Sequence, residues 1–433
     1  MRGASVLPEP GWGVKPVRYQ GLTLFGVWRF LLRLPRRVHA SRATAIAFCA
    51  MRFLDARLFL YSSLLLPCAC IEPTVSDDAR DYADSWPARA PSDLEPGAEY
   101  IGRGTANPDG PVLAWPASMA TVRFRGTGLE WNFTEQVAQT PSNYDIVVDG
   151  KVLASYLRTS AGDQRAELVS GLSNTEHEVS IVKRTEGAYG TTISRGFTPL
   201  GDGAAILAPP SKFPHKVMFV GDSITAGYGV LGASTDCAGD AVVQNARLSW
   251  ASVFSRRVGA EAHLIAWSGK GLIRNLNRAN PLLIPVIESR TTPLLEAAWD
   301  PAGFTPDLIV VNVGTNDIGS PNSDPGPAFG VAYQSYLRAL LTRYPTAHIA
   351  AVLGPMISNA DGLLDKMRRY VKAGATDVLR AEGKTSVHFV ELNVQSPVDG
   401  YGCESHPSKR TAKIIARTLG RFAERELKWT WAE

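Results

Sequence analysis

The sequence predicts a small all-β sandwich followed by a three-layer α/β domain built on a parallel sheet. Two observations predict this order. Segments of alternating or β-branched residues follow one another in the first part, whereas short apolar runs separated by helical stretches follow Pro209 and Pro210. The chain of 433 residues, 45% of them hydrophobic, is also long enough to bury two cores.

The first part expected to fold spans residues 97–205. Its candidate strands are rich in Val, Ile, Phe, Tyr and Trp, and they are residues 122–124, 129–133, 144–148 and 178–182. Glycine-containing turns separate them, and Asp149-Gly150 is a typical hairpin turn. Because no long helical periodicity interrupts this segment, we expect a β-sandwich of the jelly-roll type.

The second part spans residues 211–428 and alternates strand with helix. Its candidate strands are apolar throughout, as in a sheet buried on both faces, and they are residues 217–220, 263–267, 308–313, 349–353 and 387–390. Helical stretches are expected at residues 245–258, 328–343 and 363–381 and after Ser408. Such sheets bind ligands beyond the carboxyl ends of their strands. Four candidate site residues follow strand ends or lie in the last loop: Ser223, Gly269, Asn316 and His406.

The N-terminal 70 residues do not read as part of a fold. After Met51 come two arginines, an apolar stretch and then Pro67-Cys68-Ala69-Cys70, an order typical of an export signal. We expect residues 1–70 to be an extension carrying a cleaved signal or lipoprotein-like segment, which in the second case would leave a lipid anchor on Cys70. An apolar tail that stays attached is the alternative. If the export signal begins at Met51, residues 1–50 would be an upstream extension that results from a misplaced start codon. Residues 71–96 would be a polar linker, and the protein a secreted or cell-envelope protein of a bacterium.

The charge and the cysteine content of the chain limit the kinds of ligand and partner that we expect. The net charge of +4 is slight for 45 basic and 41 acidic residues, and much of the excess precedes residue 60, so no nucleic-acid partner is expected. No His/Cys cluster has metal-ligand spacing, and we expect no metal, no cofactor and a monomer. Cys237 and Cys403 fall on loops at one edge of the sheet, where an exported protein would form a disulfide; two buried free thiols are the alternative.

Ser223 lies in residues 221–225 (Gly-Asp-Ser-Ile-Thr), directly after a predicted strand. A serine hydroxyl is a poor nucleophile at neutral pH, so it needs a base for its proton and fixed donors for the oxyanion that forms. His406 offers the base, and Asn316 offers a neutral donor. Each residue also has a structural interpretation: Ser223 as a helix cap, His406 as a helix-entry histidine and Asn316 as a turn brace.

Four blocks of the chain resemble the signature blocks of SGNH, or GDSL, hydrolases: residues 221–225, 268–271 (Ser-Gly-Lys-Gly), 314–317 (Gly-Thr-Asn-Asp) and 406–408 (His-Pro-Ser). Further features narrow the resemblance: residues 225–229 (Thr-Ala-Gly-Tyr-Gly), 266–271, 114–116 (Ala-Trp-Pro) and 182–186 (Val-Lys-Arg-Thr-Glu). With them, residues 97–428 are similar to carbohydrate esterase family 2. Its members pair a jelly roll with a flavodoxin-like SGNH domain and remove acetyl groups from plant polysaccharides, so the resemblance implies an acetylesterase acting on acetylated polysaccharide.

The resemblance also implies roles for single residues. Ser223 would be the nucleophile and His406 the general base, which later protonates the leaving sugar hydroxyl. The backbone amides of Ser223 and Gly269 and the side chain of Asn316 would donate to the oxyanion. Gly271 is an alternative to Gly269 as the amide donor.

The third member of the triad departs from the SGNH pattern. Many SGNH enzymes place an aspartate three residues before the histidine, where this chain has Cys403. We therefore expect a Ser–His dyad, with Glu404 or a nearby backbone carbonyl orienting the imidazole. Asp222 and Asp317 are expected to be structural.

The substrate is less determined than the reaction type. No apolar lid segment follows residue 210, which favours small acyl groups, and Trp267 and Tyr228 are candidates for lining the substrate cleft. Two other functions remain open: an esterase or thioesterase for short-chain esters that are not carbohydrates, and a non-catalytic carbohydrate-binding envelope protein.

Overall fold

The computed structural model describes residues 86, 87, 89–104, 110–319 and 323–432. The predicted signal segment, the anchor at Cys70 and the first part of the predicted linker lie outside the described residues. In the part of the chain that is described, no helix is both long and apolar enough to cross a membrane.

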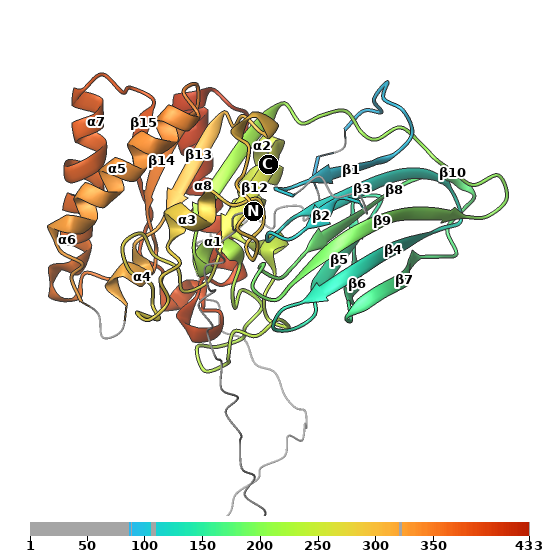
Figure 1. The fold of residues 1–433 in the computed structure, drawn as a ribbon, viewed down its shortest axis with the longest axis horizontal. Coiled ribbons are helices and arrows are strands. Elements are labelled where there is room, and N and C mark those ends of the chain that lie inside the picture. Colours follow the sequence, from blue (N-terminus) through green and yellow to red (C-terminus); the bar gives the residue numbers. More distant parts are fainter. Residues whose placement is uncertain (1–85, 88, 105–109, 320–322, 433) are drawn as a thin grey trace, which may run out of the picture. The chain divides into compact units, whose positions relative to one another are not determined.

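Two antiparallel sheets form the sandwich (Figure 1). One sheet has the order β1-β3-β8-β5-β6, with β10 also pairing with β3, and the other has the order β2-β9-β4-β7. The strands are β1 (Ala98–Ile101), β2 (Val112–Leu113), β3 (Met119–Gly126), β4 (Gly128–Val137), β5 (Asn143–Val148), β6 (Lys151–Arg158), β7 (Gly162–Val169), β8 (Thr175–Lys183), β9 (Gly190–Leu200) and β10 (Ala205–Ile206). Alternate residues such as Val122 and Phe124 on β3, and Trp131 and Phe133 on β4, point into a shared core because side chains along a strand alternate between its faces.

The second part contains a five-stranded parallel sheet with the order β12-β11-β13-β14-β15. Its strands are β11 (His215–Gly221), β12 (Ala260–Ala266), β13 (Leu308–Asn312), β14 (His348–Leu353) and β15 (Val387–Glu391). On β11, Val217 and Phe219 join one apolar cluster, whereas Met218 and Val220 join the other. Both faces are therefore buried, which explains why the strands are apolar throughout.

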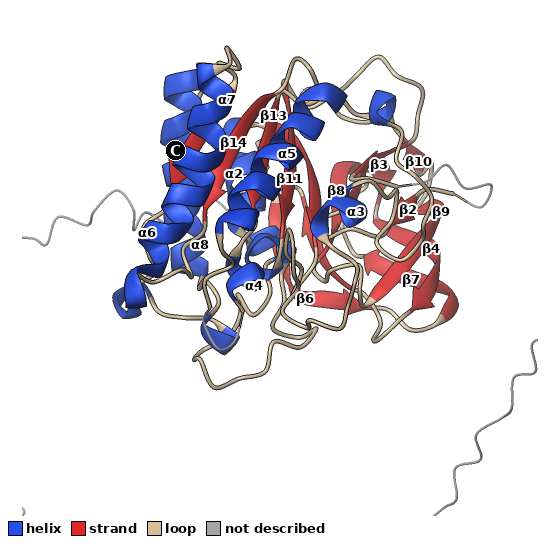
Figure 2. Ribbon diagram, turned by 60° about the vertical axis from the view of Figure 1, so that its left-hand side comes forward, coloured by secondary structure: helices blue, strands red, loops and turns tan. Residues whose placement is uncertain are grey.

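Helices cover the two faces of this sheet, as Figures 1 and 2 show. The helices are α1 (Ser223–Ala226), α2 (Trp250–Val258), α3 (Ile284–Glu288), α4 (Thr315–Ile318), α5 (Pro327–Arg343), α6 (Leu363–Arg368), α7 (Asp377–Ala381) and α8 (Lys409–Phe422). Residues of α2 and α8 belong to the first cluster, and residues of α3, α5, α6 and α7 belong to the second. Ser249 and Ser408 cap α2 and α8, each accepting from a backbone N–H of the first turn.

The predicted fold class is confirmed: an antiparallel sandwich precedes a three-layer α/β domain. The packing extends beyond the predicted bounds at both ends. Trp86, inside the predicted linker, packs against the first cluster with the Arg256 guanidinium 4.9 Å from its ring centroid. Near the C-terminus, Trp429 stacks on His215 at 4.2 Å, and the Trp431 side chain is buried. The division of the chain into domains at residues 205 and 211 stays a prediction.

Candidate active site

Ser223 is the first residue of α1, at the carboxyl end of β11, which lies between β12 and β13 in the sheet. Asp222 caps this helix, because its Oδ1 accepts from the Ile224 amide at 3.0 Å. Gly221 is needed for the tight turn from strand to helix, since a Cβ there would lie 2.2 Å from Thr225 Oγ1. The turn holds the Ser223 side chain, which is 8% exposed, at the edge of the sheet where ligands bind.

His406 lies against Ser223, although 183 residues separate them in the chain. Its Nε2 is 2.7 Å from Ser223 Oγ, and its Nδ1 is 3.1 Å from the carbonyl oxygen of Cys403. A carbonyl can only accept, so Nδ1 carries the proton and Nε2 is left as the acceptor for the serine hydroxyl. Burial lowers the pKa of His406 below its ordinary 6.5, while the Cys403 carbonyl and the Glu404 charge oppose the shift. The neutral imidazole is therefore the dominant form at neutral pH.

Glu404 does not orient the imidazole, and the carbonyl of Cys403 occupies that place instead. The Glu404 carboxylate accepts from Tyr228 Oη at 3.2 Å and from the Gly239 amide at 3.4 Å. Glu404 and Ser405 both have positive φ angles, and this turn directs the Cys403 carbonyl toward both the backbone N–H and Nδ1 of His406. Of the two alternatives that the sequence left open, the geometry favours a backbone carbonyl.

Cys237 and Cys403 form a disulfide with a Cα–Cα distance of 4.8 Å. The bond joins the loop after Tyr228 to the turn that carries His406. The Cys403 amide also donates to the Gly229 carbonyl at 3.0 Å. The backbone carbonyl that contacts His406 is therefore held in place by a covalent bond as well as by hydrogen bonds.

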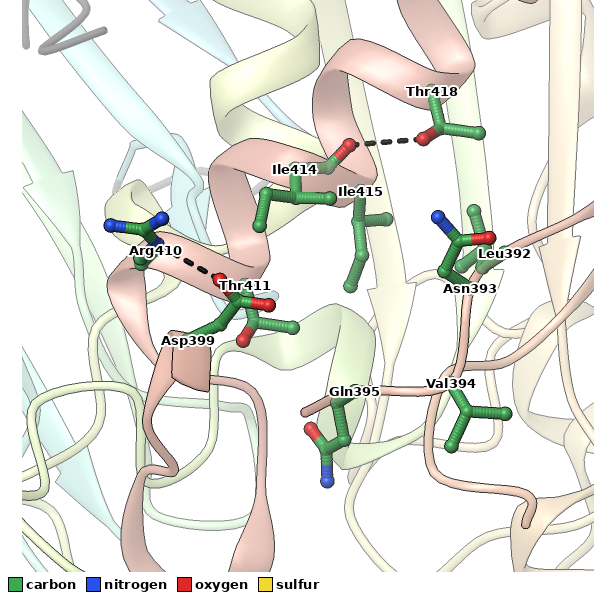
Figure 3. Close-up of a pocket in the computed structure, with 10 residues that line it drawn as sticks. All are labelled: Leu392, Asn393, Val394, Gln395, Asp399, Arg410, Thr411, Ile414, Ile415 and Thr418. Carbon is green, nitrogen blue, oxygen red and sulfur yellow. Dashed lines mark hydrogen bonds and ion pairs between the residues drawn. The ribbon is translucent and has the colours of Figure 1, made fainter. Parts of the chain in front are cut away.

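A small pocket lies between residues 392–399, which follow β15, and α8 (Figure 3). It measures about 210 Å³, and Asp399 and Arg410 form an ion pair at 2.9 Å on its wall. Gln395, which also lines it, donates from Nε2 to the Ser405 carbonyl at 2.5 Å. These contacts brace the segment directly before His406.

Gly269 and Asn316 both line a cavity of about 510 Å³ that also contains Ser223 and His406. Gly269 has a φ of +77°, a conformation that favours glycine. The Asn316 amide nitrogen donates to the Lys270 carbonyl at 2.9 Å and to Asp222 Oδ2 at 3.2 Å. Burial raises the pKa of Asp222 to about 7. The structure thus brings four predicted site residues to one cavity.

Asp317 holds the loop that follows Gly269. Its carboxylate accepts from three consecutive backbone amides: Leu272 at 2.8 Å, Ile273 at 2.8 Å and Arg274 at 3.1 Å. This carboxylate is fully buried and braces the loop, which matches the structural part predicted for it.

The two aromatic candidates for substrate contact differ. Tyr228 lines the cavity, and its ring centroid lies 4.6 Å from that of His406. Trp267 does not line it. Its ring packs on the second apolar cluster, with Lys270 Nζ 4.9 Å from the ring centroid. Its side chain is only half-buried, so contact of Trp267 with the substrate stays a prediction.

Sequence reasoning missed three residues of this region. Leu276 and Met356 supply apolar lining to the cavity. Met356 follows the end of β14, so the strand-end rule could have found it. Glu186, from the sandwich, accepts from the Ser268 amide at 2.6 Å; it ends the block of residues 182–186 that contributes to the family resemblance, but nothing in that block indicates a contact with Ser268. Among the described residues, no group of three His, Cys, Asp or Glu side chains is arranged to hold a metal ion.

Both the sandwich and the α/β part of the chain match models of known protein families. Residues 100–210 match the family model described as carbohydrate esterase 2 N-terminal, and residues 219–414 match that of the GDSL-like lipase/acylhydrolase family. A cellulase/esterase of Acetivibrio thermocellus is 34% identical over 344 residues, which are 79% of this chain and 41% of that protein. The chain thus spans less than half the length of this relative. An acetylxylan esterase/glucomannan deacetylase of Cellvibrio japonicus is 26% identical over 75% of this chain and 87% of its own.

Solved structures give the same result. A family two carbohydrate esterase from Clostridium thermocellum, in complex with cellohexaose, superposes with a TM-score of 0.72 at 32% sequence identity. The match covers 77% of this chain and 100% of that one. Since the similarity runs through the sandwich, the parallel sheet and the loops that carry Ser223 and His406, the chain belongs to carbohydrate esterase family 2.

Proposed function

We propose that the protein is an exported serine esterase that removes O-acetyl groups from polysaccharide. The observation that carries this proposal is the 2.7 Å contact between Ser223 Oγ and His406 Nε2, with the Cys403 carbonyl at Nδ1. This geometry leaves the histidine ready to accept the serine proton. The name and substrate of the Cellvibrio japonicus relative, an acetylxylan esterase/glucomannan deacetylase, support acetylated xylan or glucomannan as the substrate class.

The first half of the reaction forms an acyl-enzyme. Ser223 Oγ attacks the acetyl carbon while its proton passes to His406 Nε2, and the carbonyl oxygen becomes an oxyanion. The Ser223 and Gly269 amides and Asn316 Nδ2 donate to it. The longer Asn316 contact, at 3.2 Å to Asp222 Oδ2, is the one that the oxyanion would replace. The C–O bond to the sugar then breaks, and the Nε2 proton moves to the sugar oxygen.

The second half regenerates the serine. Water attacks the acetyl carbon and gives its proton to His406 Nε2, and the second tetrahedral intermediate uses the same donors. Its collapse releases acetate, and the proton returns to Ser223 Oγ. The Cys403 carbonyl stabilises the imidazolium in both halves without taking a proton, because it accepts from Nδ1–H throughout.

The export part of the proposal rests on the sequence of residues 51–70, with Cys70 as the candidate lipid anchor. A disulfide between Cys237 and Cys403 supports an oxidising compartment, where such bonds persist. Mass spectrometry of the protein from membrane and medium fractions of the source cells would test both outcomes. A diacylglyceryl mass on Cys70 would establish the anchor, and an unmodified Cys70 in an uncleaved chain would remove it.

The substrate class is tested by acetate release from acetylated xylan, acetylated glucomannan and a soluble aryl acetate under the same conditions. Release from either polymer supports the carbohydrate assignment. Turnover of the soluble ester alone would keep the serine esterase and remove the polysaccharide. Binding of polysaccharide without hydrolysis of any ester would instead indicate a non-catalytic carbohydrate-binding protein.

A further inference from the structure

A loop of the sandwich reaches the loop that carries Gly269. Between β8 and β9 lies Glu186, whose side chain is 2% exposed. Its Oε2 accepts from the backbone N–H of Ser268 at 2.6 Å. Ser268 immediately precedes Gly269, the residue whose amide we assign to the oxyanion. The sandwich residue Glu186 therefore binds the backbone N–H that immediately precedes the Gly269 N–H, which we assign as an oxyanion donor.

Glu186 is itself held by contacts on both sides. The Tyr189 amide donates to its carbonyl at 3.2 Å, and Gln244 Nε2 lies 3.5 Å from its Oε1. Gln244 also donates to Tyr189 Oη at 2.7 Å. In addition, the Ala246 amide donates to the Arg184 carbonyl at 2.8 Å, which joins the start of the same loop to the catalytic part.

Burying the Glu186 carboxylate is energetically unfavourable, which suggests that its contact with the Ser268 amide has a function. Burial of a carboxylate is unfavourable unless its oxygens are satisfied, and burial raises the pKa of Glu186, with the Ser268 amide as the main opposing effect. Asp317 anchors the amides of residues 272–274 on the other side of Gly269. Gly269 thus lies between two segments that are each fixed by a buried carboxylate, one of them from the sandwich.

We propose that Glu186 is a positioning residue of the esterase site, which fixes the Ser268 amide and thereby directs the Gly269 N–H toward the oxyanion. This inference rests on the proposed function, because it assigns the sandwich a part in the same reaction. The sandwich then completes the oxyanion site rather than serving only as an attached module. The effect falls on the transition state, since the oxyanion exists only there and in the tetrahedral intermediates.

Four variants of the full chain test this: Glu186→Ala, Glu186→Asp, Glu186→Gln and the control Asp145→Asn. Asp145 is also a buried carboxylate of the sandwich. It accepts from Asn245 Nδ2 at 2.8 Å and from Arg247 Nε at 2.7 Å and forms an ion pair with Arg184 at 3.7 Å, but it does not contact the Gly269 loop. The kinetics of aryl acetate hydrolysis, the Tm and the affinity for a short alkylboronic acid are measured. Boron accepts the Ser223 oxygen and forms a tetrahedral adduct that resembles the intermediate.

Glu186→Ala is expected to lower kcat about ten- to a hundredfold, as for a small misplacement of a catalytic group, with KM within about threefold. Boronic acid affinity should fall by the same factor as kcat/KM. Glu186→Gln keeps an oxygen acceptor at the same length and should retain most of kcat, whereas Glu186→Asp withdraws the carboxylate and should not. Asp145→Asn should lower Tm and leave kcat unchanged.

Unchanged kcat in Glu186→Ala would overturn the inference, as would an equal kcat loss in Asp145→Asn or a Gln variant as impaired as the Ala variant. Failure of the nearly isosteric Gln variant to fold would also overturn it, because the carboxylate would then hold the fold rather than the loop. If the parent hydrolyses no acetyl ester, the proposed function itself fails, a result distinct from all of these.

Discussion

His406 Nδ1 contacts the carbonyl oxygen of Cys403 at 3.1 Å, so the residue that orients the base is also the residue that carries a disulfide. The orienting group needs no carboxylate, because a carbonyl fixes the tautomer equally well. It does need a rigid backbone. The bond to Cys237 and the hydrogen bond from the Cys403 amide to Gly229 provide that rigidity.

Reduction of the disulfide should therefore lower both stability and activity. The bond spans 166 residues, and its loss is expected to reduce the free energy of unfolding by about 2–5 kcal/mol. The kcat for aryl acetate should fall in the same samples as the His406 turn loosens. Thermal unfolding and kinetics with and without a reductant check this, and the double variant Cys237→Ser/Cys403→Ser, insensitive to reductant, is the control. Full kcat in the reduced parent at a temperature where it is folded would contradict the positioning by the disulfide.

Glu404→Gln should change kcat little, within about threefold, because the Glu404 carboxylate contacts Tyr228 and Gly239 rather than Nδ1 of His406. Its charge nevertheless raises the pKa of His406, so the acid limb of the kcat/KM profile should move to lower pH in the variant. A pH–rate profile of parent and variant measures both effects. A loss as large as that of His406→Ala would show that the carboxylate, not the carbonyl, orients the base.

The acid limb of the parent should lie below pH 6.5, because burial lowers the pKa of His406. The same shift affects stability. Between the folded pKa and 6.5 the unfolded chain binds more protons than the folded one, so the free energy of unfolding falls as the pH falls through this window. Comparing denaturant unfolding of the parent and His406→Asn across that range isolates this contribution. An acid limb above 6.5 would contradict the burial argument.

The variant Gly269→Ala tests the effect of backbone strain at this position without a steric clash. A Cβ at this position would meet nothing closer than Leu276 Cβ at 3.9 Å, so the cost is the positive φ of +77°, expected at about 1–2 kcal/mol. Relief of that strain would turn the amide away from Ser223 and lower kcat more than it changes KM. Chemical denaturation and steady-state kinetics test the two parts separately. An unchanged kcat would contradict the assignment of the Gly269 amide to the oxyanion, and the Gly271 amide is no substitute because it donates to Asn275 Oδ1 at 2.9 Å.

Much of the site follows from the sequence because of one rule about parallel sheets. Ser223 and Asn316 come directly after strands β11 and β13, and such strands end at the same edge. The local blocks around them then limit which residues can react. His406 does not follow a strand directly, but residues 406–408 match a signature block of the family, which identifies this histidine from the sequence.

The remaining features depend on contacts that no local pattern records. Glu186, in the loop after β8, contacts Ser268, in the loop after β12, across 82 residues, so neither strand period nor motif spacing indicates the contact. Trp267 follows the end of β12, but its half-buried ring packs against the second apolar cluster and does not line the cavity, which its position in the sequence does not indicate. Glu404 has a positive φ angle, and the turn that it forms directs the Cys403 carbonyl toward the His406 imidazole. The Glu404 carboxylate does not take that place, and the sequence alone does not indicate this.

The central claim is that Ser223 is acetylated and deacetylated in each turnover. Its most direct test is acetate release by the parent, Ser223→Ala and the exposed control Ser155→Ala, on acetylated xylan and glucomannan and on an aryl acetate. Rapidly quenched samples are digested, and their peptides are analysed by mass spectrometry. The account predicts a loss of at least about a thousandfold in Ser223→Ala alone, and an added acetyl mass on a Ser223 peptide of the parent. Equal acetate release by parent and Ser223→Ala would contradict it.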